Sequence, residues 1–203
     1  VYLLWHKKLP NQAELDGFKK ELAENMEVPQ GIIDHLKSYD VTKVHPMAAL
    51  RTAVSMLAVY DDEADVMDPE ANKRKAIRLQ AKIGTIVAAF ARIRKGLEPV
   101  SPRKDLSYAE NFLYMLNGKE PNEIEVEAID KALVLHADHE LNASTFTARV
   151  CVATLSDVYS GITAAIGALK GPLHGGANEN VMKMLLEIGE EENAIPYVEK
   201  KLA

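Results

Sequence analysis

Hydrophobic side chains recur at intervals of three and four positions along most of the chain, which is the spacing of one face of an α-helix. The first such stripe runs through residues 15–26 and follows Asn11 and Glu14, which have the spacing of a capping box. The alternation of apolar and polar positions that marks a half-buried strand is almost absent. The pattern therefore predicts an all-α fold, with helices joined by short loops.

Capping signals indicate where several later helices begin. Asp68-Pro69 predicts the cap and first position of a long helix that stops at Gly96. Pro46 is expected in the first turn of an earlier helix. Two more capping boxes have the same spacing as the first: Ser107 with Glu110, and Asn122 with Glu125.

The most apolar stretch, residues 148–169, is expected to form one long helix. Ser156, Asp157 and other polar residues interrupt it, so we predict a helix packed within the protein and not a membrane span. Its small side chains recur every three or four positions and form a flat face for close helix packing. The pattern is compatible with two uses of this face: the protein's own core, or an interface between two subunits.

Composition narrows the choice of partner and compartment. Of 203 residues, 47% are hydrophobic and 27% charged, which is ordinary for a globular protein. Thirty acidic against 24 basic residues give a formal net charge of −6, which argues against a nucleic-acid partner. Cys151 is the single cysteine, so an internal disulfide is excluded and a reducing compartment, the cytoplasm, is expected.

The first candidate site is a histidine enclosed by glycines, in the run Gly171-Pro172-Leu173-His174-Gly175-Gly176. We expect His174 on a loop before an amphipathic helix at residues 177–188. Positive charge at a helix N-terminus disfavours imidazolium, so the ring is expected to be neutral and to donate one hydrogen bond. Such a donor suits a developing enolate oxygen. The alternative is an ordinary turn whose glycines only end the preceding helix.

A second candidate site lies at the end of the helix that begins near Asn122. His136 continues the apolar stripe of that helix and His139 follows one turn later, so both imidazoles are expected to face inward. Three interpretations remain: structural histidines bonded to backbone, a metal-binding pair, or a site where His139 donates to an anionic or carbonyl-bearing substrate. The chain has no HExxH pattern and no paired Glu-x-x-His, which disfavours the metal. Asn142 or Ser144 is expected to cap the next helix.

Together, the runs His136-Ala137-Asp138-His139-Glu140-Leu141-Asn142 and Gly171-Pro172-Leu173-His174-Gly175-Gly176-Ala177-Asn178 resemble the citrate synthase family in its shorter prokaryotic form. The resemblance extends along nearly the whole chain. It includes Trp5-His6-Lys7-Lys8-Leu9-Pro10, His45-Pro46-Met47, Met67-Asp68-Pro69 and Asn111-Phe112-Leu113-Tyr114-Met115-Leu116. Citrate synthases and 2-methylcitrate synthases share these motifs, so they leave the acyl group open.

The resemblance implies an enzyme of the tricarboxylic acid cycle, or its methylcitrate relative, that condenses an acyl-CoA with oxaloacetate and then hydrolyses the thioester. It implies no metal and no permanently bound cofactor, with acetyl-CoA or propionyl-CoA as a substrate. His174 matches the histidine that hydrogen-bonds the thioester carbonyl and stabilises its enol or enolate. His139 matches the histidine that binds oxaloacetate, and His136 matches a less constant position. A homodimer formed through residues 144–169 is also expected.

The chain departs from the family in what it lacks. The Gly-Phe-Gly-His motif with a second catalytic histidine, the catalytic aspartate and the arginines that hold oxaloacetate do not occur before Ala203. We therefore expect a piece of a longer polypeptide, with residues 1–174 in the large helical domain and residues 175–203 at the start of the small domain. Without a general base this piece alone is expected to be inactive. The competing classes are a non-catalytic helical scaffold and a metal-binding helical protein.

Overall fold

The structure is a computed structural model that describes residues 1–202 and, for Asn178, the backbone alone. In these residues every regular element is a helix, which confirms the all-α prediction. The α-helices are α1 (Tyr2–His6), α2 (Gln12–Glu24), α3 (Gln30–Lys37), α4 (Pro46–Leu57), α5 (Pro69–Ile93), α6 (Tyr108–Asn117), α7 (Glu123–Leu135), α8 (Ala143–Ala153), α9 (Val158–Leu169), α10 (Gly175–Ile188) and α11 (Ala194–Leu202). Two short 3₁₀ turns, η1 (Ala58–Tyr60) and η2 (Glu191–Asn193), follow α4 and α10.

Side-chain caps begin the helices where the sequence predicts them. All three predicted capping boxes are present, at Asn11, Ser107 and Asn122. Asp68 accepts hydrogen bonds from the backbone N–H groups of Glu70 and Ala71, and Pro69 follows at the first helical position. The starts of these helices are thus determined by a few neighbouring residues.

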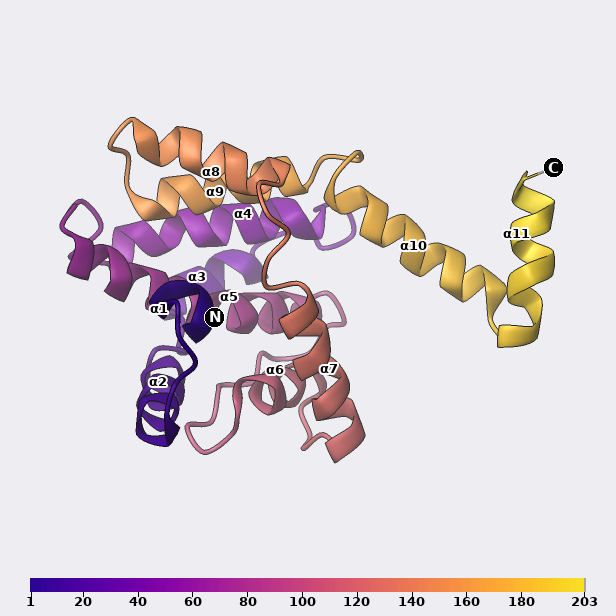
Figure 1. Ribbon diagram of the computed structural model, residues 1–203, viewed down its shortest axis with the longest axis horizontal. Helices are drawn as coiled ribbons and strands as arrows, with labels where there is room; N and C mark the ends of the chain where they lie inside the picture. The colour runs from indigo at the N-terminus through magenta and orange to yellow at the C-terminus, as the bar shows by residue number, and fades with distance from the viewer. Residues whose placement is uncertain (203) are drawn as a thin grey trace.

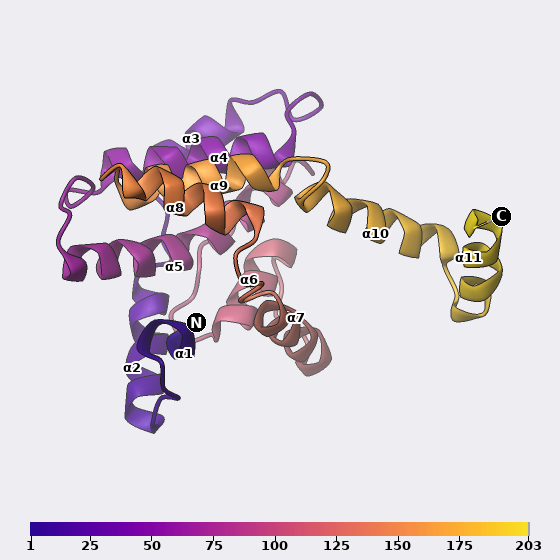
Figure 2. The same ribbon diagram turned by 45° about the horizontal axis from the view of Figure 1, so that its top comes forward.

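Two hydrophobic clusters hold the body together on either side of the long helix α5. The larger one joins α3, α4, α5 and α9 and includes Leu36, Val54, Ile86, Tyr159 and Ile166. The smaller one joins α2, α5 and α6. In Figures 1 and 2 the α8–α9 hairpin covers α4, while α2, α6 and α7 lie on the opposite side of α5.

The expected single helix over residues 148–169 is wrong, because the chain breaks between Ala153 and Val158 and folds back as the antiparallel pair α8 and α9 (Figure 1). Leu155 adopts the left-handed conformation with φ 64°, and Asp157 caps α9 by accepting a hydrogen bond from the Ser160 backbone N–H at 2.9 Å. A Cβ added to Gly161 of α9 would lie 2.7 Å from a methyl carbon of Val152 in α8. Small residues of this stretch therefore bring the two arms of one hairpin together.

Two cations of α5, the buried Lys75 and the half-buried Arg78, attach the segment between η1 and α5 to the body. Lys75 is fully buried and donates hydrogen bonds to the carbonyls of Ala64 at 2.9 Å and Val66 at 2.7 Å. Arg78 pairs with the Asp61 carboxylate at 2.8 Å, and the Tyr159 hydroxyl donates to the same carboxylate. Asp61 thus connects α5 with the start of α9.

Helices α10 and α11 extend away from the body as an arm (Figures 1 and 2). The predicted apolar stripe of α10 is therefore only partly covered: Met184 and Ile188 are half-buried, while Val181 and Leu185 are exposed. None of the described helices is both long and apolar enough to cross a membrane.

Candidate functional site

His174 lies between α9 and α10, on the loop where the sequence predicts it. The helix after it starts at Gly175, two residues earlier than expected, and the His174 side chain is half-buried. Its Nε2 lies 2.7 Å from Oγ of Ser144, the second residue of α8. Ser144 Oγ also lies 3.1 Å from the backbone carbonyl of Ala165 in α9. The imidazole is therefore held against the open end of the α8–α9 hairpin.

The glycines around His174 create the space for this loop. Gly171 N–H donates to the Ala168 carbonyl and ends α9, as the alternative interpretation of these glycines requires. Gly175 allows a close approach of the chain to α9, because a Cβ at this position would lie 2.2 Å from the Leu169 carbonyl oxygen. No residue with a side chain fits there without moving the loop that carries His174.

The prediction that His136 and His139 face inward is wrong, because both side chains are exposed. Helix α7 ends at Leu135, so His136 becomes its C-cap instead of continuing the buried stripe, and Leu133 on that stripe is itself 44% exposed. His136 Nδ1 donates to the Ala132 carbonyl at 2.7 Å, which satisfies one of the free carbonyls at the helix end. The ring of His139 is exposed and makes no hydrogen bond to any described residue.

The two histidine-bearing loops approach the same end of the hairpin. Asn142, one of the two predicted caps, starts α8 by accepting a hydrogen bond from the Thr145 N–H at 2.9 Å. Ser144, the other candidate, instead contacts His174. The sequence suggested only a capping role for Ser144, because its contact with His174 depends on the hairpin that the sequence did not predict.

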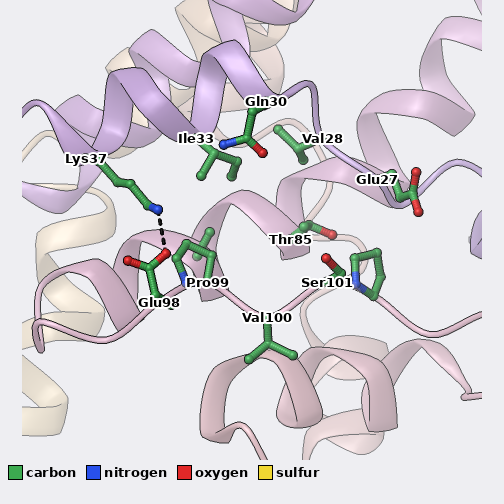
Figure 3. Close-up of a pocket in the computed structure, with 12 residues that line it drawn as sticks. Glu27, Val28, Gln30, Ile33, Lys37, Thr85, Glu98, Pro99, Val100 and Ser101 are labelled. Carbon is green, nitrogen blue, oxygen red and sulfur yellow. Dashed lines mark hydrogen bonds and ion pairs between the residues drawn. The ribbon is translucent and has the colours of Figure 1, made fainter.

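Two cavities of the described part of the molecule lie elsewhere. One of about 330 Å³ is enclosed by α3, α5 and the loop 98–102, and the Lys37–Glu98 ion pair closes one side of it (Figure 3). Another of about 590 Å³ lies beside Asp61, Arg78 and Lys82. Neither is lined by His139 or His174.

Charged groups beside the second cavity already bind one another. Hydrogen bonds from Arg74 and Arg78 lower the pKa of Glu63 to about 2. Burial opposes ionisation of Asp61, but hydrogen bonds from Tyr159 and the Glu63 N–H, together with the charge of Arg78, keep its pKa below the usual range. Within residues 1–202, no three His, Cys, Asp or Glu side chains gather as a metal site would require. The ion pairs of Asp61 and Glu63 with Arg74 and Arg78 therefore join the segment between η1 and α5 to helix α5.

The fold and the loop motifs agree with one family of proteins. The family model described as "Citrate synthase, C-terminal domain" matches residues 1–203, and the chain belongs to the citrate synthase family. It is 73% identical over 202 residues to Citrate synthase 2 of Bacillus subtilis, covering all of this chain and 54% of that protein. It is 45% identical to the 2-methylcitrate synthase of Mycobacterium tuberculosis over 203 residues, which are 51% of that protein.

A solved structure supports the same fold. The citrate synthase of Thermoplasma acidophilum, described in a ternary complex with carboxymethyl coenzyme A and oxaloacetate, is similar with a TM-score of 0.87 at 31% identity. The match covers 97% of this chain and 51% of that one. The chain thus spans about half the length of the relatives that it matches.

Proposed function

We propose that this chain is the part of a citrate synthase that activates the acyl-CoA thioester and helps to bind oxaloacetate. Residues 1–174 are assigned to the large helical domain and residues 175–203 to the start of the small domain, since α10 and α11 leave the body at this point (Figure 1). The observation that carries the proposal is the half-buried His174, fixed by Ser144 in a chain of this family.

The role of His174 is to donate a hydrogen bond to the thioester carbonyl oxygen of the acyl-CoA. Removal of a proton from the adjacent carbon by a base gives an enolate, whose negative oxygen this donor stabilises. The enolate carbon then attacks the ketone carbon of oxaloacetate, and water cleaves the thioester to release CoA as a thiol. His139 is assigned to oxaloacetate, as a donor to one of its oxygens.

The Ser144 hydroxyl determines which nitrogen of a neutral His174 ring can act as this donor. Ser144 has one proton and two nearby acceptors, His174 Nε2 and the Ala165 carbonyl. When the proton goes to Nε2, the ring hydrogen is on Nδ1, which can then donate to a thioester. When Ser144 donates its proton to the Ala165 carbonyl, the ring hydrogen is on Nε2. It is then donated to Ser144 Oγ and is not available to a thioester. We assign the first arrangement to the reactive state.

A hybrid enzyme tests this proposal. Residues 1–203 replace the matching part of the Bacillus subtilis relative, and CoA thiol release is measured with oxaloacetate and acetyl-CoA. The hybrid is expected to be active, the His174→Ala variant to be inactive, and the 203-residue chain alone to release no CoA. Activity that survives the loss of His174, or an active isolated chain, would contradict the proposal.

Ser144→Ala in the hybrid is expected to lower kcat about 3- to 10-fold, because the net value of one hydrogen bond to the ring is lost. Ser144→Thr retains the hydroxyl and is the matched control, expected to keep most of the activity. Equal losses in both variants would show that the volume of the side chain matters and the hydroxyl does not.

The acyl group is the second question for the same assay. Acetyl-CoA is the proposed substrate, supported by 73% identity to a citrate synthase, while the 2-methylcitrate synthase relative is 45% identical. A higher kcat/KM for propionyl-CoA would reassign the chain to 2-methylcitrate synthesis.

We propose no permanently bound cofactor, since the acyl-CoA binds and leaves as a substrate. The single cysteine, Cys151, supports a cytoplasmic location.

The proposed assembly is a homodimer formed through residues 144–169. Apolar side chains remain exposed on the outer face of α8 and at the tip of the hairpin: Phe146 at 58%, Val150 at 53% and Leu155 at 81%. Several exposed large apolar side chains on one short hairpin are typical of subunit contacts. A symmetric dimer would cover the same face on both subunits.

A further inference from the structure

The loop that carries His139 is exposed, and side-chain hydrogen bonds to the backbone fix its two ends. Residues 136–141, between α7 and α8, are all exposed. The loop is fixed at its first residue by the His136 ring on the Ala132 carbonyl, and at its last by the Asn142 side chain on the Thr145 N–H. His139 lies midway between these two attachments, too far along the chain for either to set its orientation.

A third hydrogen bond closes the middle of the loop around His139. Asp138 Oδ1 accepts a hydrogen bond from the Glu140 N–H at 3.2 Å. This Asx turn begins one residue before His139 and ends one residue after it, so it restricts the dihedral angles of His139 itself. Glu140 then adopts φ 55°, the left-handed conformation that side chains disfavour, and turns the chain toward Asn142.

We propose that Asp138 is a positioning residue for oxaloacetate, acting through His139 without touching the substrate. The inference rests on the proposed assignment of His139 to oxaloacetate. An acidic side chain beside a dicarboxylate site weakens binding by like-charge repulsion, although exposure screens this effect. The carboxylate oxygen offsets that cost by closing the turn, which restricts the backbone of His139 and so limits the region that its imidazole can reach before the substrate arrives.

Kinetics of the hybrid enzyme distinguish the effect of the Asp138 hydrogen bond from the effect of the Asp138 charge. Asp138→Ala removes the acceptor, so the KM for oxaloacetate is expected to rise about 3- to 10-fold with little change in the KM for acetyl-CoA. Asp138→Asn removes the charge but keeps the acceptor oxygen, so its KM for oxaloacetate is expected to stay within about twofold. Equal effects of the two variants, or a fall in KM with both, would overturn the proposal.

A matched pair of variants at Glu140, whose N–H donates to Asp138, tests the same turn from its other end. Glu140→Gly and Glu140→Val both remove a charge, but only valine opposes the left-handed conformation. The KM for oxaloacetate is expected to rise several-fold in Glu140→Val and to change little in Glu140→Gly. A rise in both variants would mean that the Glu140 side chain itself binds, which contradicts a role for the backbone.

A measurement without substrate distinguishes failure of the turn from failure of the proposed function. Amide hydrogen exchange of Glu140 is followed by NMR in the 203-residue chain, where Asp138→Ala is expected to accelerate it several-fold and Asp138→Asn to leave it unchanged. If the Glu140 amide exchanges as fast as in an unstructured peptide, the turn is not formed in solution and the proposal is wrong. If the Glu140 amide is protected but the hybrid does not bind oxaloacetate, the assignment of His139 to oxaloacetate is wrong. The proposed role of Asp138 is then wrong as well.

Discussion

Gly175 and Gly176 are adjacent residues with very different surroundings. A methyl group at Gly175 would lie 2.2 Å from the Leu169 carbonyl oxygen, whereas at Gly176 the nearest atom is 3.4 Å away. Gly175→Ala is therefore expected to displace His174 and lower kcat/KM of the hybrid by at least about tenfold. Gly176→Ala, the matched control, should stay within about twofold. CoA release under identical conditions gives both values, and an active Gly175→Ala enzyme would refute this account of the loop.

Acid is expected to loosen the segment between η1 and α5. Arg74 and Arg78 lower the pKa of Glu63 to about 2, against an ordinary value of 4.5 for the unfolded chain. Because the pKa is lower in the folded state, the stabilisation is fully present above about pH 5 and is lost as the pH falls toward 2. Urea unfolding between pH 7 and pH 3 measures the effect. Glu63→Gln should show a shallower fall, and parallel curves for the two proteins would contradict this pairing.

Individual site residues were predictable where neighbours in the sequence define them. The loop before α10 follows from the glycines around His174, because local backbone requirements decide it. The orientation of His136 could not be obtained in this way. It depends on α7 ending at Leu135, and on how little of α7 the rest of the molecule covers.

The closeness of α8 and α9 depends on the absence of a side chain at Gly161. Gly161→Ala would bring a methyl within 2.7 Å of Val152, and we expect a loss of about 1 kcal/mol or more in the free energy of unfolding. The double variant with Val152→Ala removes the opposing methyl and is expected to recover most of that loss. Chemical unfolding of the four proteins in this cycle gives the coupling, and simple additivity would show that the contact does not control packing.

The break between these helices shows the limit of hydrophobic periodicity. Asp157 caps α9 by accepting from the Ser160 N–H, but the pair lacks the Glu that makes the Asn11–Glu14 capping box visible in the sequence. Although Ser156 and Asp157 are polar, Leu155 and Val158 keep the helical spacing of apolar positions across the break, so the pattern favours one helix. What separates the arms is the left-handed Leu155 together with packing of α8 on α9, and a pattern along the chain does not report that contact.

The exposed apolar face of α8 is the proposed contact between the two subunits of the dimer. Phe146→Glu with Val150→Glu places charges on that face, and is expected to weaken dimerisation by about 100-fold or more. Val59→Glu changes another highly exposed apolar residue, on η1, and should leave the dimer intact. Sedimentation velocity over a range of concentrations distinguishes them. A monomeric parent, or a dimer unaffected by the double change, would rule out this interface.

The arm formed by α10 and α11 has a consequence for local stability. A 14-residue helix that gains little from tertiary packing is close to its own helix–coil equilibrium, since isolated helices of this length are marginal in water. Amides in α10 should therefore exchange with solvent through local fraying, many times faster than those of the buried α5, and independently of global unfolding. His174 lies at the boundary between the two: Ser144 fixes its ring to the body, where slow exchange is expected, while the helix that follows it is expected to fray.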